Sequence, residues 1–261
     1  MNLPTSVERS IKDAYEAGRI YKTSTICAHA DRESPEYAER LLWEKLAMVR
    51  RHATPGRLVD LCCATGVHLI ALSDLSNDAI GIDFSAPFVE KAADDARAAN
   101  LGHVRFMHGD AKQIPLESGS VATLYSLSAL YVIPGVRQVV GEIARVLTPG
   151  GHCILDFGNS RSLNTYCVSK YTELPPSFHV PLTDIRAMLA ANGLDVIEHR
   201  AFQLLPLWAD RPRWLWPLLH PGWKTVMKHR IGSRMIDEWV SNAPGLKRIA
   251  FRHVIVAEKK G

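Results

Sequence analysis

The sequence lacks a hydrophobic run that could cross a membrane, because no stretch of about 18 residues is free of both charge and proline. Its opening residues, MNLPTSVERS, contain no apolar core of a secretory signal. The five cysteines are odd in number, have no metal-ligand spacing, and include the adjacent pair Cys62 and Cys63, which disulfide geometry disfavours. We therefore expect a cytoplasmic protein in a reducing compartment, with no transmembrane helix and no metal site.

The sequence also has little excess charge and no low-complexity tract. The net charge is +4, and the basic residues do not form the clustered stripe that is typical of nucleic-acid-binding surfaces. Hydrophobic residues make up 47% of the chain and charged residues 22%, which is usual for a folded globular protein. A length of 261 residues fits one large domain with an appended lobe. We expect no nucleic-acid partner.

Strand and helix patterns alternate through the middle of the chain. Apolar, β-rich runs predict strands at 57–63, 79–83, 104–108, 121–127 and 152–157, and helical patterns lie between them at 67–75, 86–100 and 136–147. A helix at 182–192 and strands at 194–202 and 251–258 follow. The pattern predicts an α/β fold: a doubly wound, mostly parallel seven-stranded sheet of Rossmann-like type, covered by helices on both faces.

Four segments follow from this order of elements. We expect a helical N-terminal cap at 1–53, a cofactor-binding domain at 54–203, a Trp- and Pro-rich insert at 204–246, and a return to the sheet at 247–261 as its closing strand. The insert interleaves four tryptophans with cationic residues, and its prolines exclude one long spanning helix. Such a segment could be a lid over an amphiphilic acceptor, a membrane contact, or a small core of its own.

The first strand is followed by the turn DLCCATG at 60–66. In doubly wound sheets, ligands bind outside the carboxyl ends of the strands, where such a turn must approach the ligand closely. Small residues at Cys62, Ala64 and Gly66 permit this approach, but the side chains of Cys62 and Ala64 disfavour a positive φ. A nicotinamide-binding G-x-G-x-x-G turn would need glycine where Leu69 stands, so a dehydrogenase is disfavoured.

Together with the later strands, this turn resembles the class I S-adenosylmethionine-dependent methyltransferases. Asp83 ends the second strand, Asp110 follows the third, and EIARVLTPGG at 142–151 is similar to the helix and turn before the family's fifth strand. The resemblance covers about residues 58–157, and the strand at 251–258 fits the family's final antiparallel hairpin. It implies S-adenosylmethionine as the cofactor. Read alone, Asp83 could cap the next helix with Ser85, and Asp110 could lie in a surface turn.

The resemblance also implies which residues hold the cofactor. Asp83 would accept the ribose hydroxyls, Asp110 would bind the adenine amino group, and Tyr21 would line the methyl-donor pocket. The expected cofactor-binding residues are Asp60, Cys62, Ala64, Gly66, Asp83, Phe84, Asp110, Ala111, Leu127 and Tyr21.

Methyl transfer is an in-line displacement, for which the protein supplies mainly orientation and exclusion of water. A hydroxyl or carbon acid as acceptor would benefit from a general base, for which His179, His220 and His229 are candidates. Tyr131 is a further candidate for a catalytic role, because the resemblance implies that it lines the methyl-donor pocket together with Tyr21. None is singled out by the sequence. The segment SLSALY at 126–131 differs from the Asn/Asp-Pro-Pro-aromatic sequence of base and amide methyltransferases, which argues against those acceptors.

Two classes of function therefore remain open. One is a methyltransferase that acts on a small or amphiphilic acceptor of saccharide, lipid-linked or secondary-metabolite type, with possible peripheral membrane contact through the insert. The other is a catalytically degenerate cofactor-binding module that regulates or scaffolds a partner, which the replacements at Cys62 and Ala64 suggest. The sequence leaves the acceptor atom and the oligomeric state open.

Overall fold

The structure is a computed structural model and describes residues 6–17, 29–171 and 177–261. A seven-stranded sheet crosses the molecule in the order β3-β2-β1-β4-β5-β9-β6. Its strands are β1 (Leu58–Leu61), β2 (Ala79–Asp83), β3 (Val104–His108), β4 (Val121–Ser126), β5 (Leu147–Gly158), β6 (Leu194–Phe202) and β9 (Arg252–Lys259). The first five pair in parallel, and β9 runs antiparallel between β5 and β6. The predicted doubly wound, mostly parallel fold is confirmed.

The predicted bounds of β2, β3 and β6 agree with the structure residue for residue. Strand β5 begins earlier than predicted, because Leu147 already pairs with Val121 before a bulge, and regular pairing resumes at His152. The sequence pattern missed this start because the intervening Pro149 and two glycines indicated only a turn.

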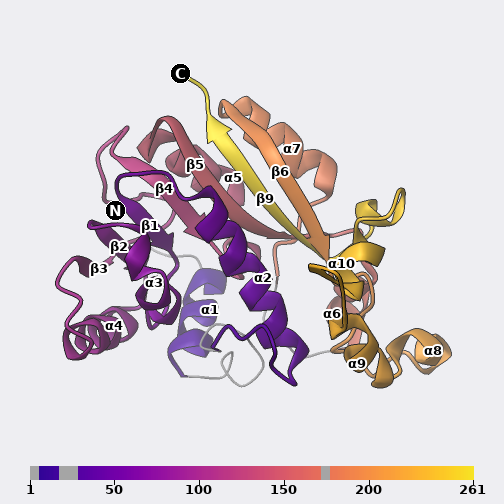
Figure 1. Ribbon diagram of the computed structural model, residues 1–261. Helices are drawn as coiled ribbons and strands as arrows, with labels where there is room; N and C mark the ends of the chain where they lie inside the picture. Colours follow the sequence, from indigo (N-terminus) through magenta and orange to yellow (C-terminus); the bar gives the residue numbers. More distant parts are fainter. Residues whose placement is uncertain (1–5, 18–28, 172–176) are drawn as a thin grey trace.

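Helices cover both faces of the sheet (Figure 1). They are α1 (Ser6–Glu16), α2 (Tyr37–His52), α3 (Val67–Ala71), α4 (Ala86–Ala98), α5 (Val136–Val146), α6 (Leu163–Tyr171) and α7 (Leu182–Ala191). Residues on α5 and α7 pack in one core, and residues on α2 and α3 pack in a second core on the opposite face.

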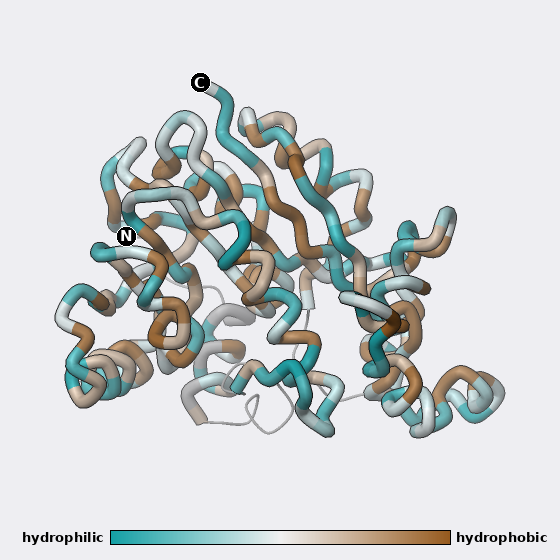
Figure 2. The backbone as a smooth tube through the Cα atoms, in the orientation of Figure 1, coloured by the Kyte–Doolittle hydropathy of each residue, from teal (hydrophilic) through white to brown (hydrophobic). Residues whose placement is uncertain are grey.

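Strand residues alternate between these two cores. Leu155 and Ile255 belong to the core beneath α5 and α7, whereas Ile154 and Val254 belong to the core beneath α2. This is the period-2 arrangement of a sheet that is buried on both faces. Figure 2 shows the result as a hydrophobic stretch through the middle of β9. None of the described helices is long and apolar enough to cross a membrane.

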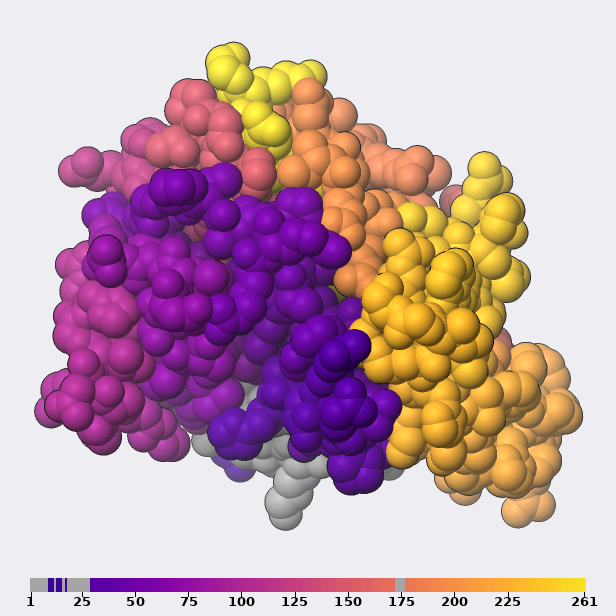
Figure 3. Space-filling view, in the orientation of Figure 1, coloured from indigo at the N-terminus to yellow at the C-terminus, as the bar shows by residue number. Residues whose placement is uncertain are grey.

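The insert forms a lobe beside the C-terminal ends of β5 and β6 and the N-terminal end of β9 (Figure 1). It contains α8 (Trp216–Leu219), α9 (Gly222–Lys228), the two-stranded ribbon β7 (Arg230–Ile231) and β8 (Arg234–Met235), and α10 (Ile236–Ser241). Met227 and Met235 of this lobe join the core beneath α2. The lobe therefore shares its core with the rest of the molecule, and its surface abuts α2 (Figure 3).

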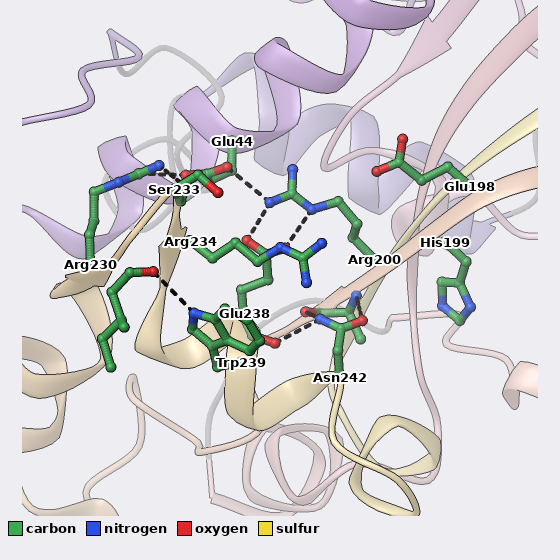
Figure 4. A network of polar contacts seen from close by, with 12 residues as sticks. Glu44, Glu198, His199, Arg200, Arg230, Ser233, Arg234, Glu238, Trp239 and Asn242 are labelled. Atoms are coloured by element: carbon green, nitrogen blue, oxygen red, sulfur yellow. Dashed lines mark hydrogen bonds and ion pairs between the residues drawn. The ribbon is translucent and has the colours of Figure 1, made fainter.

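A buried network of charges fixes the lobe in place (Figure 4). Glu44 of α2 accepts hydrogen bonds from Arg230 of β7 at 2.5 Å and from Arg200 of β6 at 3.1 Å. Arg200 also donates to Glu238 of α10 at 2.7 Å. Because both carboxylates are almost fully buried and are paired with arginine, removal of one partner would leave an uncompensated buried charge. The network therefore holds α2, β6 and the lobe in one arrangement.

Candidate cofactor site

The turn after β1 holds three residues in the left-handed region. Cys62, Ala64 and Gly66 have φ values of 66°, 48° and 72°. The first two thus adopt the glycine-like conformation that the sequence analysis considered unfavourable, at a cost of about 1–2 kcal/mol each. At Gly66 a side chain is also excluded by space, because a Cβ would lie 2.5 Å from the ring of Phe106. The turn therefore has positive φ at all three positions, although two of them are not glycine.

Asp83 braces this turn from the end of β2. One carboxylate oxygen accepts the N–H of Ala64 at 2.9 Å, and the other accepts the N–H of Ser85 at 2.9 Å. The second bond goes to the N–H of Ser85, the N-cap residue of α4, which makes no side-chain capping bond itself, so the alternative of a helix cap formed by Asp83 and Ser85 is wrong. The first bond joins Asp83 to the turn. Burial raises the pKa of Asp83, and the two backbone donors oppose that shift. Each oxygen still has a lone pair, so ribose hydroxyls can be accepted by the same carboxylate.

Asp60 lies at the start of the turn and is almost fully buried. Burial raises the pKa of Asp60 to about 8, the Tyr125 hydroxyl opposes this shift, and the neighbouring Asp83 carboxylate adds to it. Oδ2 of Asp60 has no hydrogen-bond partner within the described part of the chain. Burial thus holds Asp60 as the neutral acid near pH 7, and a cationic ligand at the turn would favour its ionised form.

Four of the remaining cofactor candidates, Phe84, Asp110, Ala111 and Leu127, lie after the ends of β2, β3 and β4. Asp110 is exposed and accepts the N–H of Lys112 at 2.8 Å, so it does lie in a surface turn, beside the buried Ala111. Phe84 follows Asp83 and stacks at 5.4 Å on Tyr15 of α1. Leu127 is buried directly after β4. Tyr21 lies outside the described residues.

These residues fit the adenosyl cofactor that the resemblance implies. Asp83 and Asp110 would hold the ribose and adenine on the β2 and β3 side of the turn. The unpartnered oxygen of Asp60 suits the positively charged end of the cofactor, and the left-handed turn lets backbone approach it closely. These roles remain predictions for the residues named.

Among the catalytic candidates, His179 and Tyr131 lie together. Their rings are 5.6 Å apart, and Phe178 donates its N–H to the carbonyl of Tyr131 at 2.6 Å. His220 and His229, by contrast, are exposed on the lobe, where His220 accepts the N–H of Gly222 at 3.1 Å. Neither has a contact, among the described residues, that places it with Tyr131. The geometry favours His179 over the other two histidines.

Sequence reasoning missed three charged side chains that lie close to Tyr131. Lys45 of α2 donates to Oδ2 of Asp156 in β5 at 2.6 Å, and Nη1 of Arg252 in β9 lies 4.0 Å from Oδ1 of the same carboxylate. All three side chains are buried. Because they come from elements that are far apart in sequence, no local motif connects them. The one sequence signal for these residues is that each is a charged residue within an otherwise apolar strand or helix pattern.

Comparison with known proteins identifies the central part of the chain. The family model described as "Methyltransferase domain" matches residues 58–151. A demethylmenaquinone methyltransferase from Geobacillus kaustophilus is 31% identical over 132 residues, which cover 48% of this chain and 56% of that protein. The chain thus spans little more than half the length of this curated relative.

Solved structures share the fold over most of the chain. A geranyl diphosphate C-methyltransferase from Streptomyces coelicolor, solved with Mg²⁺, geranyl diphosphate and S-adenosyl-L-homocysteine, aligns with a TM-score of 0.60 at 17% identity, covering 88% of this chain and 89% of that one. The [4+2]-cyclase SpnF aligns with a TM-score of 0.64 at 19% identity, covering 100% and 98%. At such identities the likeness concerns the fold alone.

Proposed function

We propose that this protein, whose residues 58–151 match the methyltransferase domain model, is a class I S-adenosylmethionine-dependent methyltransferase that methylates a small amphiphilic acceptor. The observation that carries the proposal is the backbone at Cys62 and Ala64, which keeps the left-handed path although neither residue is glycine. The positive φ values at Cys62 and Ala64 thus weigh against the catalytically degenerate module, which the replacement of glycine at these positions had suggested.

The chain's own residues supply binding, orientation and shelter from water. The bound cofactor supplies a methyl group activated on a sulfonium. Asp83 holds the turn and offers its remaining lone pairs, while Asp60 offers a carboxylate oxygen on the same side. Tyr131 and His179 follow on the β4 and β5 side, where the acceptor would meet the methyl group. Transfer then depends on proximity and alignment.

An amphiphilic acceptor is supported by the chemistry of the lobe and by the relatives. The acceptors in the relatives' names, demethylmenaquinone and geranyl diphosphate, are both lipid-like. On the lobe, a shallow hollow of about 400 Å³ is lined by Trp216, Pro217, His220, Gly222, Trp223 and Val226. Aromatic and aliphatic walls of this kind suit an apolar chain.

The test is transfer of a radiolabelled methyl group from S-adenosylmethionine to candidate acceptors, followed by extraction into organic solvent. A quinol with an isoprenoid tail, geranyl diphosphate and a simple hexose make up the acceptor panel. We expect label in a lipid-like product, and much less of it with Asp83→Asn. Tight binding of the cofactor with no transfer to any acceptor would favour the degenerate module instead.

We further propose that the lobe contacts an anionic membrane surface. Residues 211–236 carry six lysines and arginines and no acidic residue. Trp208, Trp214 and Trp216 are exposed, Trp214 by 70%, so the alternative that they form the lobe's own core is wrong for these three. Exposed tryptophans with cationic neighbours favour the interface of an anionic bilayer.

Flotation with phosphatidylcholine vesicles, with and without phosphatidylserine, tests this membrane contact. We expect binding only to the anionic vesicles and loss of that binding in the Trp214→Ser, Trp216→Ser double variant. Ile197→Ser, on the exposed face of β6, is the matched control and should bind like the wild type. Equal flotation of the double variant and the wild type would contradict the proposal.

A further inference from the structure

The guanidinium of Arg252 is buried, and two of its nitrogens lack a hydrogen-bond acceptor among the described residues, although the Tyr131 hydroxyl and the Asp156 carboxylate favour its charged form. Arg252 opens β9 and pairs there with Gly158 of β5 and Phe202 of β6, so it lies at the edge where β5 ends. Its Cζ lies 4.0 Å from the ring centre of Tyr131 and 4.6 Å from that of Phe251. The residue is 9% exposed, and Nε and Nη1 have no partner among the residues with described positions. Buried donors of a charged group are rarely left unpaired.

The carboxylate that interacts with the charge of Arg252, that of Asp156, already accepts hydrogen bonds from other residues. Oδ2 of Asp156 accepts from Lys45 Nζ at 2.6 Å and from the Ser128 N–H at 3.0 Å. Oδ1 lies 4.0 Å from Arg252 Nη1, which is beyond hydrogen-bond distance, and it has no described partner of its own. Tyr37, which also faces Arg252, donates its hydroxyl to Asp237 at 2.7 Å.

Two buried cations therefore share one carboxylate. With Lys45 protonated, Lys45, Asp156 and Arg252 together carry one surplus positive charge, and their side chains are 3%, 0% and 11% exposed. Burial and Arg252 lower the pKa of Lys45, and Asp156 opposes that shift. A buried charge without a counter-charge costs several kcal/mol. This trio, with Tyr131 and His179, is here called the Arg252 cluster. It lacks one negative charge.

His179 adds no positive charge to the cluster. The hydroxyl of Thr165 donates to the carbonyl of Asn159 at 2.6 Å, so it can only accept from His179 Nδ1 at 2.8 Å. This leaves Nε2 with the lone pair, and Nε2 is buried without a described partner. Burial and Arg252 lower the pKa of His179 to about 4, so the ring is neutral near pH 7.

The position of His179 is built into the fold. A Cβ at Gly158 would lie 2.3 Å from the His179 ring, so only glycine at the end of β5 lets the ring approach. The ring also contacts Phe251 with centroids 5.1 Å apart. Guanidinium donors and an imidazole acceptor thus flank the same two aromatic rings, Tyr131 and Phe251.

The Arg252 cluster lies at the end of the sheet where β4 and β5 end, which is also the end that carries the cofactor turn. Asp83 and Asp110 end β2 and β3, on one side of the cofactor turn. Tyr131 follows β4, on the other side, and β9 lies two strands beyond β4, at about 10 Å given the usual strand spacing. A group of the acceptor molecule remote from its methylated atom can reach Arg252.

We propose that the Arg252 cluster binds an anionic oxygen group of the methyl acceptor, such as a carboxylate. This inference rests on the proposed function and adds the charge of the substrate to it. The anion accepts from Nε and Nη1 of Arg252 and neutralises the surplus charge. His179 Nε2 accepts a hydrogen bond from a hydroxyl beside the anionic group, and Tyr131 and Phe251 enclose the apolar body.

Calorimetric titration with two isosteric probes tests the proposal. 2-Naphthoate and its neutral amide, 2-naphthamide, are titrated separately into the protein loaded with S-adenosyl-L-homocysteine. We expect the wild type to prefer 2-naphthoate at least tenfold, because a bidentate, charge-assisted contact discriminates by about that factor. Arg252→Gln should lose the preference. Arg145→Gln, which removes an arginine paired with Glu142 on α5, should retain it.

Absence of 2-naphthoate binding to the wild type, equal affinity for both probes, or an unchanged preference in Arg252→Gln would overturn the proposal. If Arg252→Gln does not fold, Arg252→Lys carries the test, because lysine keeps the charge but not the two-pronged contact and should lower the preference severalfold. Repeating the probe titrations without S-adenosyl-L-homocysteine separates the two proposals. S-adenosyl-L-homocysteine is also titrated by itself. A protein that does not bind S-adenosyl-L-homocysteine but still prefers 2-naphthoate contradicts the methyltransferase proposal alone. A protein that binds S-adenosyl-L-homocysteine but shows no preference between the probes contradicts this site alone.

Discussion

Charge balance in the Arg252 cluster makes an asymmetric stability prediction. Asp156→Asn removes the one carboxylate that the described residues place between Lys45 and Arg252, and it raises the surplus from one positive charge to two. Removing one partner of a buried pair costs about 3–5 kcal/mol, and here two cations lose it. Lys45→Met brings the trio to neutrality and leaves Asp156 with the Ser128 N–H and Arg252. We expect this variant to lose about 1–2 kcal/mol.

Urea unfolding at pH 7, followed by tryptophan fluorescence, measures both variants. The difference of about 2 kcal/mol should separate the two midpoints by roughly 1 M at the m-values usual for single domains. Both variants should retain the wild-type slope, so that midpoints are comparable. A Lys45→Met variant as unstable as Asp156→Asn, or less stable, would refute the charge balance described above.

The same cluster predicts a dependence of stability on acid. Burial alone would raise the pKa of Asp156, but Lys45 and Arg252 outweigh it and hold the pKa below its usual value. The carboxylate therefore contributes stability that is fully present above the usual pKa, near 4, and is lost as pH falls through the lower folded value. This loss should be absent from Asp156→Asn, whose unfolding free energy should fall less steeply below pH 4.

Two further predictions concern the cofactor turn. Ala64→Gly relieves a positive φ and should cost less than about 0.5 kcal/mol or stabilise the protein, whereas Ala93→Gly in the middle of α4 should cost about 1 kcal/mol in the same urea assay. The reverse order would contradict the strain at Ala64. Asp60, with a pKa of about 8, is protonated in the free protein at pH 7 and should release a proton when the cationic cofactor binds. Calorimetry in two buffers of different ionisation enthalpy measures this proton, which Asp60→Asn should abolish.

Much of the fold could be predicted because its signals are local. The apolar runs at β2, β3 and β6 have the right length and are bounded by turn residues, so their bounds agree with the structure. Helix α6 went unpredicted, since Leu163–Tyr171 has no strong apolar periodicity. Much of its apolar packing is against the lobe, where Cys167 meets Leu215 and Leu219.

Only the site residues that directly follow a predicted strand could be predicted from the sequence. The acids at Asp60, Asp83 and Asp110 follow successive strands, so their order places them at one edge of the sheet. The conformation of Cys62 and Ala64 could not be predicted, because residue type gives the cost of a positive φ but not whether the surrounding structure pays it. Long-range contacts such as Lys45 with Asp156 depend on how α2 crosses the sheet, which no local pattern specifies.

The most direct test of the central claim is calorimetric titration of S-adenosylmethionine and S-adenosyl-L-homocysteine into the wild type, Asp83→Asn and Asp195→Asn. Asp195 is an exposed carboxylate at the start of β6, away from the cofactor turn, and serves as the matched control. We predict micromolar binding to the wild type and to Asp195→Asn, and at least tenfold weaker binding to Asp83→Asn. No binding to the wild type, or equal binding to all three proteins, would contradict a cofactor site built on the turn at 60–66.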